Sequence, residues 1–212
     1  MRQYFSGNRG LVFRAVIFII IVVMGTCLIV MVKNRGYRLI SVETDCGVVT
    51  GRKAQYDTID GEREICYEFM NIPYAVPPVD ELRWKPPILM NSKDDNCWTG
   101  DYYTATEYHK KMCMQYVQDF TDPTGYKIVG SEDCLYLSVR SPNLRGKLPV
   151  LVWIHGGSLE GGYNDDEGYS TDPEFATAMG VVAVNINYRL AMFGFLTLEA
   201  LWETGGNETE GK

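Results

Sequence analysis

Two short apolar runs with a capped helix between them constrain the fold of this chain more than any other feature. The runs are Pro149–Ile154, PVLVWI, and Val181–Ile186, VVAVNI, and each is typical of a strand buried on both faces of a sheet. Between them, Thr171–Glu174 predicts a helix start, because its threonine or aspartate can cap and its proline and glutamate suit the first turn. The helix should run to about Met179, before Gly180. Strand, crossover helix and strand predict two parallel strands, and hence an α/β fold.

The segment before these runs is predicted to hold three more strands and long irregular stretches. Gly47–Lys53 and Ile65–Ile72 are rich in β-branched and aromatic residues, and a turn near Asp60–Gly61 separates them. Five prolines interrupt regular structure between residues 73 and 87. Residues 92–130 are polar and aromatic without a clean period, so we expect mostly loop there. Leu135–Val139 alternates like a half-buried strand.

An uncharged apolar run near the amino terminus predicts a membrane anchor. Residues 15–32 are 18 positions without charge, bounded by Arg14 and Lys33, and this length can span a bilayer. A cleaved signal peptide would have a shorter apolar region and a small-residue cleavage site, and a buried core helix would have a polar face. We therefore predict a cytoplasmic tail at residues 1–14, a single transmembrane signal anchor at 15–32 and a juxtamembrane connector at 33–45.

The rest of the chain is predicted to lie outside the cytoplasm. Five of the six cysteines follow the apolar run, and Asn207 begins a glycosylation sequon. Disulfides persist in oxidising compartments, so we expect a single-pass type II membrane protein with an extracellular or lumenal domain. Residues 39–212 carry 14 basic and 27 acidic side chains, which argues against nucleic acid as a partner.

The glycines directly after the first apolar run are the most informative chemical feature. His155 is followed by Gly156, Gly157 and Ser158. Glycines at a strand end let the backbone approach a ligand closely and can direct successive N–H groups into one space. Such donors stabilise the oxyanion formed when a carbonyl is attacked, and losing one costs about 3–4 kcal/mol of barrier. A plain glycine-rich turn is the alternative, which this short segment alone does not exclude.

Five ordered blocks make the chain similar to a known family. The blocks are Phe69–Ala75 with Pro77–Pro78, Leu82–Trp84 with Pro86–Pro87, Ser131–Leu137, His155–Ser158, and Asn187–Leu190 with Phe193–Leu196. From about Cys46 to Leu196, the chain resembles the amino-terminal portion of the type-B carboxylesterase and cholinesterase family of α/β hydrolases. The resemblance implies a mostly parallel sheet of eight or more strands, serine-ester chemistry and an oxyanion hole at the glycines.

The resemblance also assigns roles to residues of the glycine segment. It implies that Gly157 and Ser158 supply the oxyanion N–H donors and that Gly156 supports the turn. Enzymes of the family usually have a third glycine where this chain has Ser158, whose Cβ restricts the backbone. Family members that serve adhesion can also carry a serine there, so this residue leaves both functions open.

The catalytic triad of the family has no counterpart in these 212 residues. No Gly-x-Ser-x-Gly occurs, and the two histidines, His109 and His155, do not lie where the family places its base. We expect nucleophile, acid and base beyond Lys212, which would make residues 46–212 an incomplete carboxylesterase domain; a genuinely truncated product is the alternative. His155 is predicted to order the glycine segment rather than to transfer protons.

The resemblance further implies one disulfide and one ion pair. Cys113 and Cys134 match a family disulfide whose loop borders the active site, and Arg83 and Glu132 match a buried family ion pair; two solvated charges are the alternative for the pair. In cholinesterases this loop carries a tryptophan that binds choline. Here it has aromatic residues but no tryptophan, which speaks against choline esters. Those aromatic residues are Tyr116, Phe120 and Tyr126.

The other three extracytoplasmic cysteines have no family partner. Two of Cys46, Cys66 and Cys97 can pair with each other, and the third can be free or bridge two chains. A metal site is the alternative, but no C-x-x-C or paired histidine supports it, and no cofactor is implied.

Two functions follow from these predictions. The first is carboxylic ester hydrolysis by serine acyl transfer in a complete, membrane-anchored carboxylesterase-like protein, with a small carboxylic ester as substrate. The second is a catalytically inactive adhesion or receptor protein on the same scaffold, with a cell-surface protein as partner. The sequence beyond residue 212 would discriminate between them.

Overall fold

The computed structural model describes residues 37–57, 61–91, 93, 96–98, 102–106, 111–166 and 171–197. The predicted tail, the anchor at 15–32, His109 and the sequon at Asn207 lie outside these residues. Among the residues that are described, no helix has the length and apolar character needed to cross a membrane.

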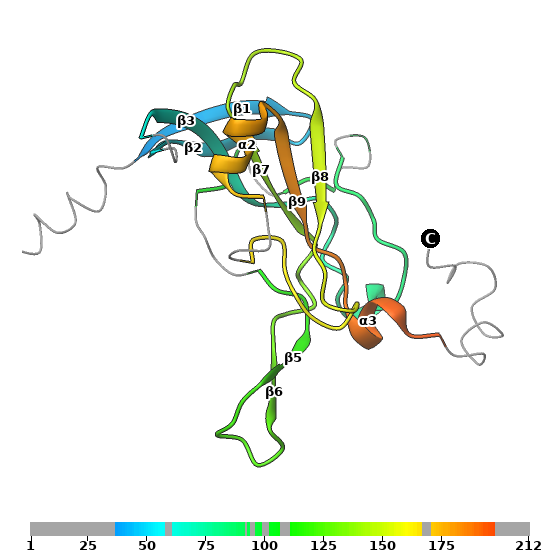
Figure 1. The fold of residues 1–212 in the computed structure, drawn as a ribbon. Helices are drawn as coiled ribbons and strands as arrows, with labels where there is room; N and C mark the ends of the chain where they lie inside the picture. Colours follow the sequence, from blue (N-terminus) through cyan, green and yellow to red (C-terminus); the bar gives the residue numbers. More distant parts are fainter. Residues whose placement is uncertain are drawn as a thin grey trace, which may run out of the picture. The chain divides into compact units, whose positions relative to one another are not determined.

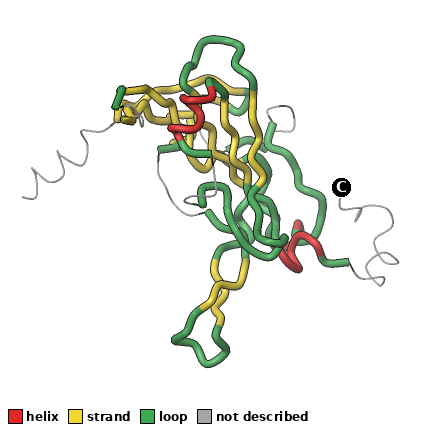
Figure 2. Tube along the Cα trace, viewed as in Figure 1, coloured by secondary structure: helices red, strands yellow, loops and turns green. Residues whose placement is uncertain are grey.

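A mixed sheet forms the centre of the fold (Figure 1). Within the described residues it has seven strands in the order β1-β2-β3-β7-β9-β8, with β4 beside β2. The bounds are β1 Tyr37–Thr44, β2 Gly47–Asp57, β3 Arg63–Pro73, β4 Tyr102–Thr104, β7 Tyr136–Ser141, β8 Val150–Ile154 and β9 Val182–Ile186. Strands β5, Gln115–Gln118, and β6, Tyr126–Val129, form a separate hairpin that projects away from the sheet (Figure 2). The described helical elements are η1 Asp80–Leu82, α2 Pro173–Met179 and α3 Ala191–Phe195.

The strand–helix–strand unit predicted from the two apolar runs is confirmed. Strands β8 and β9 pair in parallel, with Val150 opposite Val182 and Ile154 opposite Ile186. The side chain of Asp172 accepts a hydrogen bond of 2.7 Å from the Phe175 N–H and so caps α2. Gly180 ends the helix in the left-handed conformation that glycine adopts without steric cost.

The prediction of a mostly parallel sheet is wrong for the described part of the chain. The pairs β2–β3, β3–β7 and β7–β9 are antiparallel, whereas β8–β9 and β2–β4 are parallel. The predicted hairpin accounts for one antiparallel pair, because a connection as short as that between Asp57 and Arg63 reverses the chain. A parallel neighbour in one sheet needs a longer crossover, and α2 provides one between β8 and β9.

The apolar composition of β8 predicts a strand that is buried on both faces, and this prediction is wrong. Val150, Val152 and Ile154 are 63%, 55% and 63% exposed. These side chains are exposed because β8 is the edge strand of the sheet, with β9 as its one neighbouring strand among the described residues. Strand β9 lies inside the sheet, and its Ala183 and Asn185 are buried.

Two segments predicted to be irregular contain strands. Strand β1 lies in the predicted connector at 33–45, and Ile40 and Val42 pack against the core formed around Val49 and Phe69. Strands β4, β5 and β6 lie within residues 92–130. Strand β1 has the alternation of a half-buried strand, and its nearness to the apolar run obscured that pattern.

A network of charged side chains is buried where β2, β3 and β7 meet. The carboxylate of Glu68 is fully buried and accepts bonds of 2.6 Å from Arg52 Nε and 2.5 Å from the Tyr56 hydroxyl. Arg140 Nε lies 3.6 Å from the other Glu68 oxygen. Arg140 also donates to Asp165 at 2.8 Å, and Asp165 accepts from the Ser138 hydroxyl at 2.7 Å. The network therefore ties three strands to the loop that follows β8.

Two disulfides cross-link the described domain. Cys46 pairs with Cys97 and Cys113 with Cys134, with Cα–Cα distances of 5.2 and 4.9 Å. The second is the predicted bridge, and the first settles a pairing that the sequence left open. Cys66 is free and buried, and burial raises the pKa of its thiol to about 12. The thiol therefore stays protonated at neutral pH, the form that does not attack disulfides.

Candidate active site

The glycine loop, which we define as His155–Gly162, begins where β8 ends (Figure 1). Gly157 and Gly162 have φ angles of +112° and +108°, in a region that favours glycine. A Cβ on Gly157 would lie 1.9 Å from the Gly161 carbonyl oxygen, and one on Gly162 would lie 2.5 Å from His155 Nδ1. The compact path of this loop therefore requires glycine at both positions.

The middle of the loop is a tight left-handed turn. Ser158 and Leu159 have φ angles of +56° and +63°, which cost a non-glycine residue on the order of 1 kcal/mol each. The N–H groups of Glu160 and Gly161 both donate to the Gly157 carbonyl, at 3.0 and 3.1 Å. The serine thus occupies a backbone conformation in which the third glycine usual in the family would be unstrained.

The N–H groups of Gly157 and Ser158 are available to a ligand. Both residues are exposed, and within the described part of the chain neither N–H has a hydrogen-bond acceptor. Free backbone donors at a strand end can stabilise negative charge that develops on a carbonyl oxygen. Their role as oxyanion donors, with Gly156 supporting the turn, stays a prediction.

His155 is held by the loop and its neighbours. Its side chain is buried, and its ring stacks on Tyr188 with the centroids 4.4 Å apart. The Nδ1 atom lies 2.8 Å from the Gly156 carbonyl oxygen, and the Tyr188 hydroxyl donates to the His155 carbonyl at 2.7 Å. Among the described residues no carboxylate contacts the ring. This arrangement supports an ordering role for His155 in the loop.

Three buried amide side chains hold the glycine loop or the residues just after it, and the sequence carried no signal for two of them. Asn187 accepts from the Asn164 N–H at 2.7 Å, and its own amide donates to the Lys111 carbonyl. The side chain of Asn164 donates to Ser138 at 3.3 Å. Gln115, in β5, bonds to Gly162. Asn187 belongs to a block that resembles the family, but nothing local marks Asn164 or Gln115 in the sequence.

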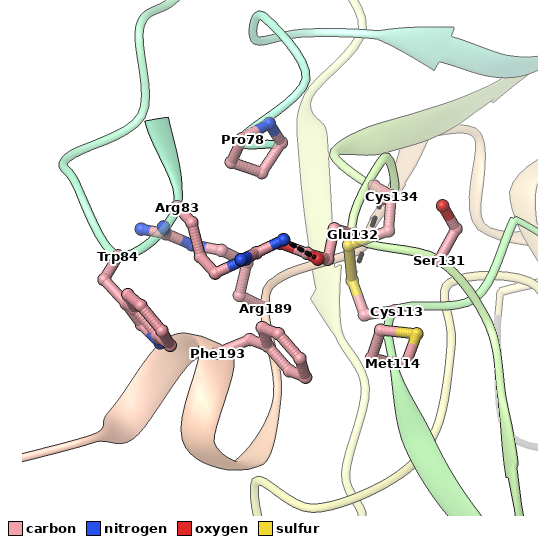
Figure 3. Close-up of a pocket in the computed structure, with 10 residues that line it drawn as sticks. All are labelled: Pro78, Arg83, Trp84, Cys113, Met114, Ser131, Glu132, Cys134, Arg189 and Phe193. Atoms are coloured by element: carbon pink, nitrogen blue, oxygen red, sulfur yellow. Dashed lines mark hydrogen bonds and ion pairs between the residues drawn. A yellow bond between two sulfur atoms is a disulfide. The ribbon is translucent and has the colours of Figure 1, made fainter. Parts of the chain in front are cut away.

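The predicted ion pair lies beside the Cys113–Cys134 bridge (Figure 3). Arg83 donates two hydrogen bonds of 2.6 Å to the two oxygens of Glu132. The pair is not fully buried, since the two side chains are 36% and 20% exposed. The hydrogen bond to Glu132 raises the pKa of Arg83. The bidentate geometry ties the proline-rich segment to the segment that precedes β7.

A small hollow beside the ion pair is too small for an ester. Its cavity volume is about 10 Å³, which is room for one water molecule. Trp84, Arg189 and Phe193 line it, together with the disulfide. The guanidinium of Arg189 has one buried nitrogen, Nη1, with no hydrogen-bond partner in the described residues, and burial lowers its pKa. This hollow is therefore not a substrate pocket.

The aromatic residues of the disulfide loop point into solvent. Tyr116, Phe120 and Tyr126 lie on the β5–β6 hairpin and are 66%, 89% and 53% exposed. The base of the hairpin reaches the glycine loop through Gln115. The hairpin is thus an exposed aromatic surface.

A metal site for the remaining cysteines is not supported. Cys46 and Cys97 are joined in a disulfide. No cluster of three metal-ligating side chains occurs among the residues that the structure describes.

In α/β hydrolases a glycine-rich loop that follows a strand supplies N–H donors to the oxyanion, and the glycine loop of this chain likewise follows a strand, β8. Residues 39–208 match the model of the carboxylesterase family, and the chain belongs to that family. This bears out the resemblance on which the expectations above rest.

Relatives and solved structures agree with this assignment. Gut esterase 1 of Caenorhabditis elegans is 34% identical over 158 residues, which are 73% of this chain and 26% of that protein. Neurotactin of Drosophila melanogaster is 38% identical over 178 residues, or 82% of this chain and 18% of that protein. A thermophilic pNB esterase structure has a TM-score of 0.58 at 30% identity, covering 80% of this chain and 32% of its own. A Geobacillus stearothermophilus carboxylesterase structure has a TM-score of 0.57 at 32% identity, covering 80% and 29%.

The chain therefore spans about a quarter of the length of the first esterase relative. It covers 32% and 29% of the chains in the two solved structures.

Proposed function

We propose that this chain is the amino-terminal, oxyanion-bearing portion of a membrane-anchored carboxylesterase-like protein. The observation that carries the proposal is the glycine loop with the free, exposed N–H groups of Gly157 and Ser158. The names of several relatives, among them gut esterase 1, denote ester hydrolases and support the same reaction.

In this proposal the chain contributes charge stabilisation to serine acyl transfer. A serine hydroxyl attacks the ester carbonyl, the carbonyl oxygen becomes an oxyanion, and the N–H groups of Gly157 and Ser158 donate to it. Each such donor is worth about 3–4 kcal/mol of barrier. The nucleophile, acid and base have no counterparts among these 212 residues, because no Gly-x-Ser-x-Gly and no suitably placed histidine occur.

The transcript beyond the codon for Lys212 tests this proposal directly. A Gly-x-Ser-x-Gly followed by a distant acid and histidine would support the esterase, and the longer product should then hydrolyse p-nitrophenyl esters. A frame that continues through the family fold with the serine replaced would refute the esterase and support the second candidate below.

We expect the 212-residue chain alone to leave p-nitrophenyl acetate hydrolysis at the uncatalysed rate. The physical reason is that oxyanion donors without a nucleophile and base have no acyl transfer to accelerate. The measurement is release of p-nitrophenol by the purified chain, with Ser158→Ala as the matched control. Hydrolysis by the wild type that disappears in the control would contradict this prediction and would make Ser158 a nucleophile.

We also expect residues 39–212 to be translocated and the apolar run at 15–32 to remain in the mature protein. The two disulfides support an oxidising compartment for the described domain. Translation with microsomes should give a membrane-bound product of full length whose domain resists added protease, and deglycosylation should shift any product modified at Asn207. A soluble product shortened at its amino terminus would contradict the anchor, and a protease-accessible domain would contradict the type II orientation.

An inactive cell-surface adhesion or receptor protein is the second candidate. The exposed aromatic hairpin that carries Tyr116, Phe120 and Tyr126 supports it, because exposed aromatic residues are enriched at protein interfaces. Ser158, a strained serine where enzymes of the family usually have a glycine, is compatible with either candidate. The relative neurotactin bears a name that denotes no hydrolase.

A further inference from the structure

Gln115 joins the disulfide loop to the glycine loop through a pair of hydrogen bonds. Its side-chain oxygen accepts from the Gly162 N–H at 2.8 Å, and its side-chain nitrogen donates to the Gly162 carbonyl at 3.0 Å. Gln115 is only 6% exposed. The amide therefore pairs with one residue of the loop as a neighbouring strand would.

The same amide is fixed on the side of the disulfide. Its nitrogen also donates to the Cys113 carbonyl at 3.1 Å, so both amide hydrogens are used. Backbone from residue 130 packs closely on that carbonyl, because a Cβ on Gly130 would lie 2.4 Å from the oxygen. The Cys113–Cys134 bridge then connects this point to Cys134, two positions before β7. A covalent and hydrogen-bonded path therefore runs from the sheet to the loop.

Gly162 is held from two sides. The His155 ring lies on one side, so close that a Cβ on Gly162 would meet Nδ1 at 2.5 Å, and the Gln115 amide binds its backbone. Gly161 also lies against Gln115, since a Cβ there would be 3.2 Å from the side-chain oxygen. Gln115 thus packs against the last two residues of the loop.

The loop needs such support because its turn is strained. Ser158 and Leu159 keep their left-handed conformation only where the surroundings hold the turn. One external support is the bond from the Ala191 N–H to the Leu159 carbonyl at 2.7 Å. The paired bonds from the Gln115 side chain to Gly162 are a second external support, at the end of the loop.

We propose that Gln115 is a positioning residue that holds the glycine loop in the conformation that presents the N–H groups of Gly157 and Ser158. A contribution of Gln115 to catalysis depends on the proposed oxyanion role of the loop. Its stabilisation of the loop conformation does not depend on that role. Loss of the amide should leave the fold intact and loosen the glycine loop selectively. The disulfide acts in the same path, because it fixes the Cys113 carbonyl that orients the Gln115 side chain.

Hydrogen exchange of the full chain in detergent micelles tests this proposal. Gln115→Met keeps the length of the side chain and removes its hydrogen bonds, and Gln118→Met is the matched control, an exposed glutamine in the same strand. In Gln115→Met we expect exchange in a peptide covering residues 156–163 to become about ten- to thirtyfold faster, the effect of losing one or two hydrogen bonds. Peptides from β2 and β3 should exchange as in the wild type, and Gln118→Met should change neither region.

Unchanged exchange at residues 156–163 in Gln115→Met would overturn the proposal. Equal acceleration in β2 and β3 would also overturn it, because Gln115 would then contribute only to global stability. If Gln115→Met does not fold, Gln115→Glu gives a second reading. Its carboxylate still accepts from the Gly162 N–H but cannot donate to the two carbonyls, and protonation restores one donor. Its loop should therefore exchange faster than wild type at neutral pH, after correction for intrinsic rates, and approach wild type as the carboxyl is protonated; a pH-independent difference would count against the proposal.

Exchange does not depend on catalysis, so the two proposals fail separately. A loop that loosens in Gln115→Met supports the positioning role even where a longer product proves to lack esterase activity. If the longer product is active, Gln115→Met should lower kcat about tenfold or more with KM little changed, as expected when a transition-state donor is misplaced. A rise in KM alone would contradict the positioning role.

Discussion

Replacing Glu68 with glutamine is expected to lower the free energy of unfolding by about 3–5 kcal/mol, the usual cost of removing one partner from a buried ion pair. The Glu68 carboxylate is fully buried and contacts Arg52, Arg140 and Tyr56. Glutamine has nearly the same shape but no charge, so two guanidinium groups that are 14% and 4% exposed lose their shared counter-ion. Asp165 remains as a partner of Arg140.

The matched control is Asp57→Asn on the same hairpin. Asp57 pairs with Arg63 at 3.2 Å, but both side chains are more than 70% exposed. Water solvates such a pair, so its loss should change stability by no more than about 0.5 kcal/mol. Thermal unfolding of the chain in detergent micelles, followed by near-ultraviolet circular dichroism, compares the two variants. A Glu68→Gln variant that unfolds as late as Asp57→Asn would show that the buried network does not hold the three strands together.

The sequence predicts local elements well where a single stretch of residues determines them. The capped helix is an example, because Asp172, Pro173 and Gly180 act within one or two turns of the chain. The β2–β3 hairpin is another, since its strands are close in sequence and pair in an antiparallel manner. The disulfide at Cys113 and the ion pair at Arg83 came instead from the family resemblance, because neither can be derived from local pattern.

The features that the sequence did not predict depend on contacts between distant segments. The exposure of β8 depends on its place at the end of the strand order, which its apolar composition does not encode. Gln115 forms a hydrogen bond with Gly162, which is 47 positions away in the sequence. Glu68 pairs with Arg140, which lies on the neighbouring strand β7. The residues next to Gln115 and Glu68 in the sequence do not indicate whether each side chain is buried against a partner or exposed to solvent. Only the folded structure distinguishes these cases.

Removal of the Cys46–Cys97 bridge by a double change to alanine is expected to destabilise the domain by about 4 kcal/mol, and removal of the Cys113–Cys134 bridge by about 3 kcal/mol. The Cys46–Cys97 bridge is expected to contribute more because it closes the longer loop, and a longer loop loses more conformational entropy in the unfolded state. The two bridges join positions that are 51 and 21 residues apart. Alanine is the suitable replacement for Cys113 and Cys134, because both are buried and a serine would bury a hydroxyl group. Thermal unfolding under non-reducing conditions measures both effects.

The two variants should differ more in where they loosen the domain than in how much. The Cys46–Cys97 bridge ties the turn between β1 and β2 to the segment before β4, so its loss should raise hydrogen exchange in β1 and β4. The Cys113–Cys134 bridge fixes the carbonyl that orients Gln115, so its loss should raise exchange at residues 156–163 as Gln115→Met does. Breaking Cys113–Cys134 without any change in the glycine loop would contradict the path from disulfide to loop, even if the stability falls as expected. If loss of either bridge raised exchange in the glycine loop equally, the domain would be destabilised as a whole. The result would then argue against a specific connection between the Cys113–Cys134 bridge and the glycine loop.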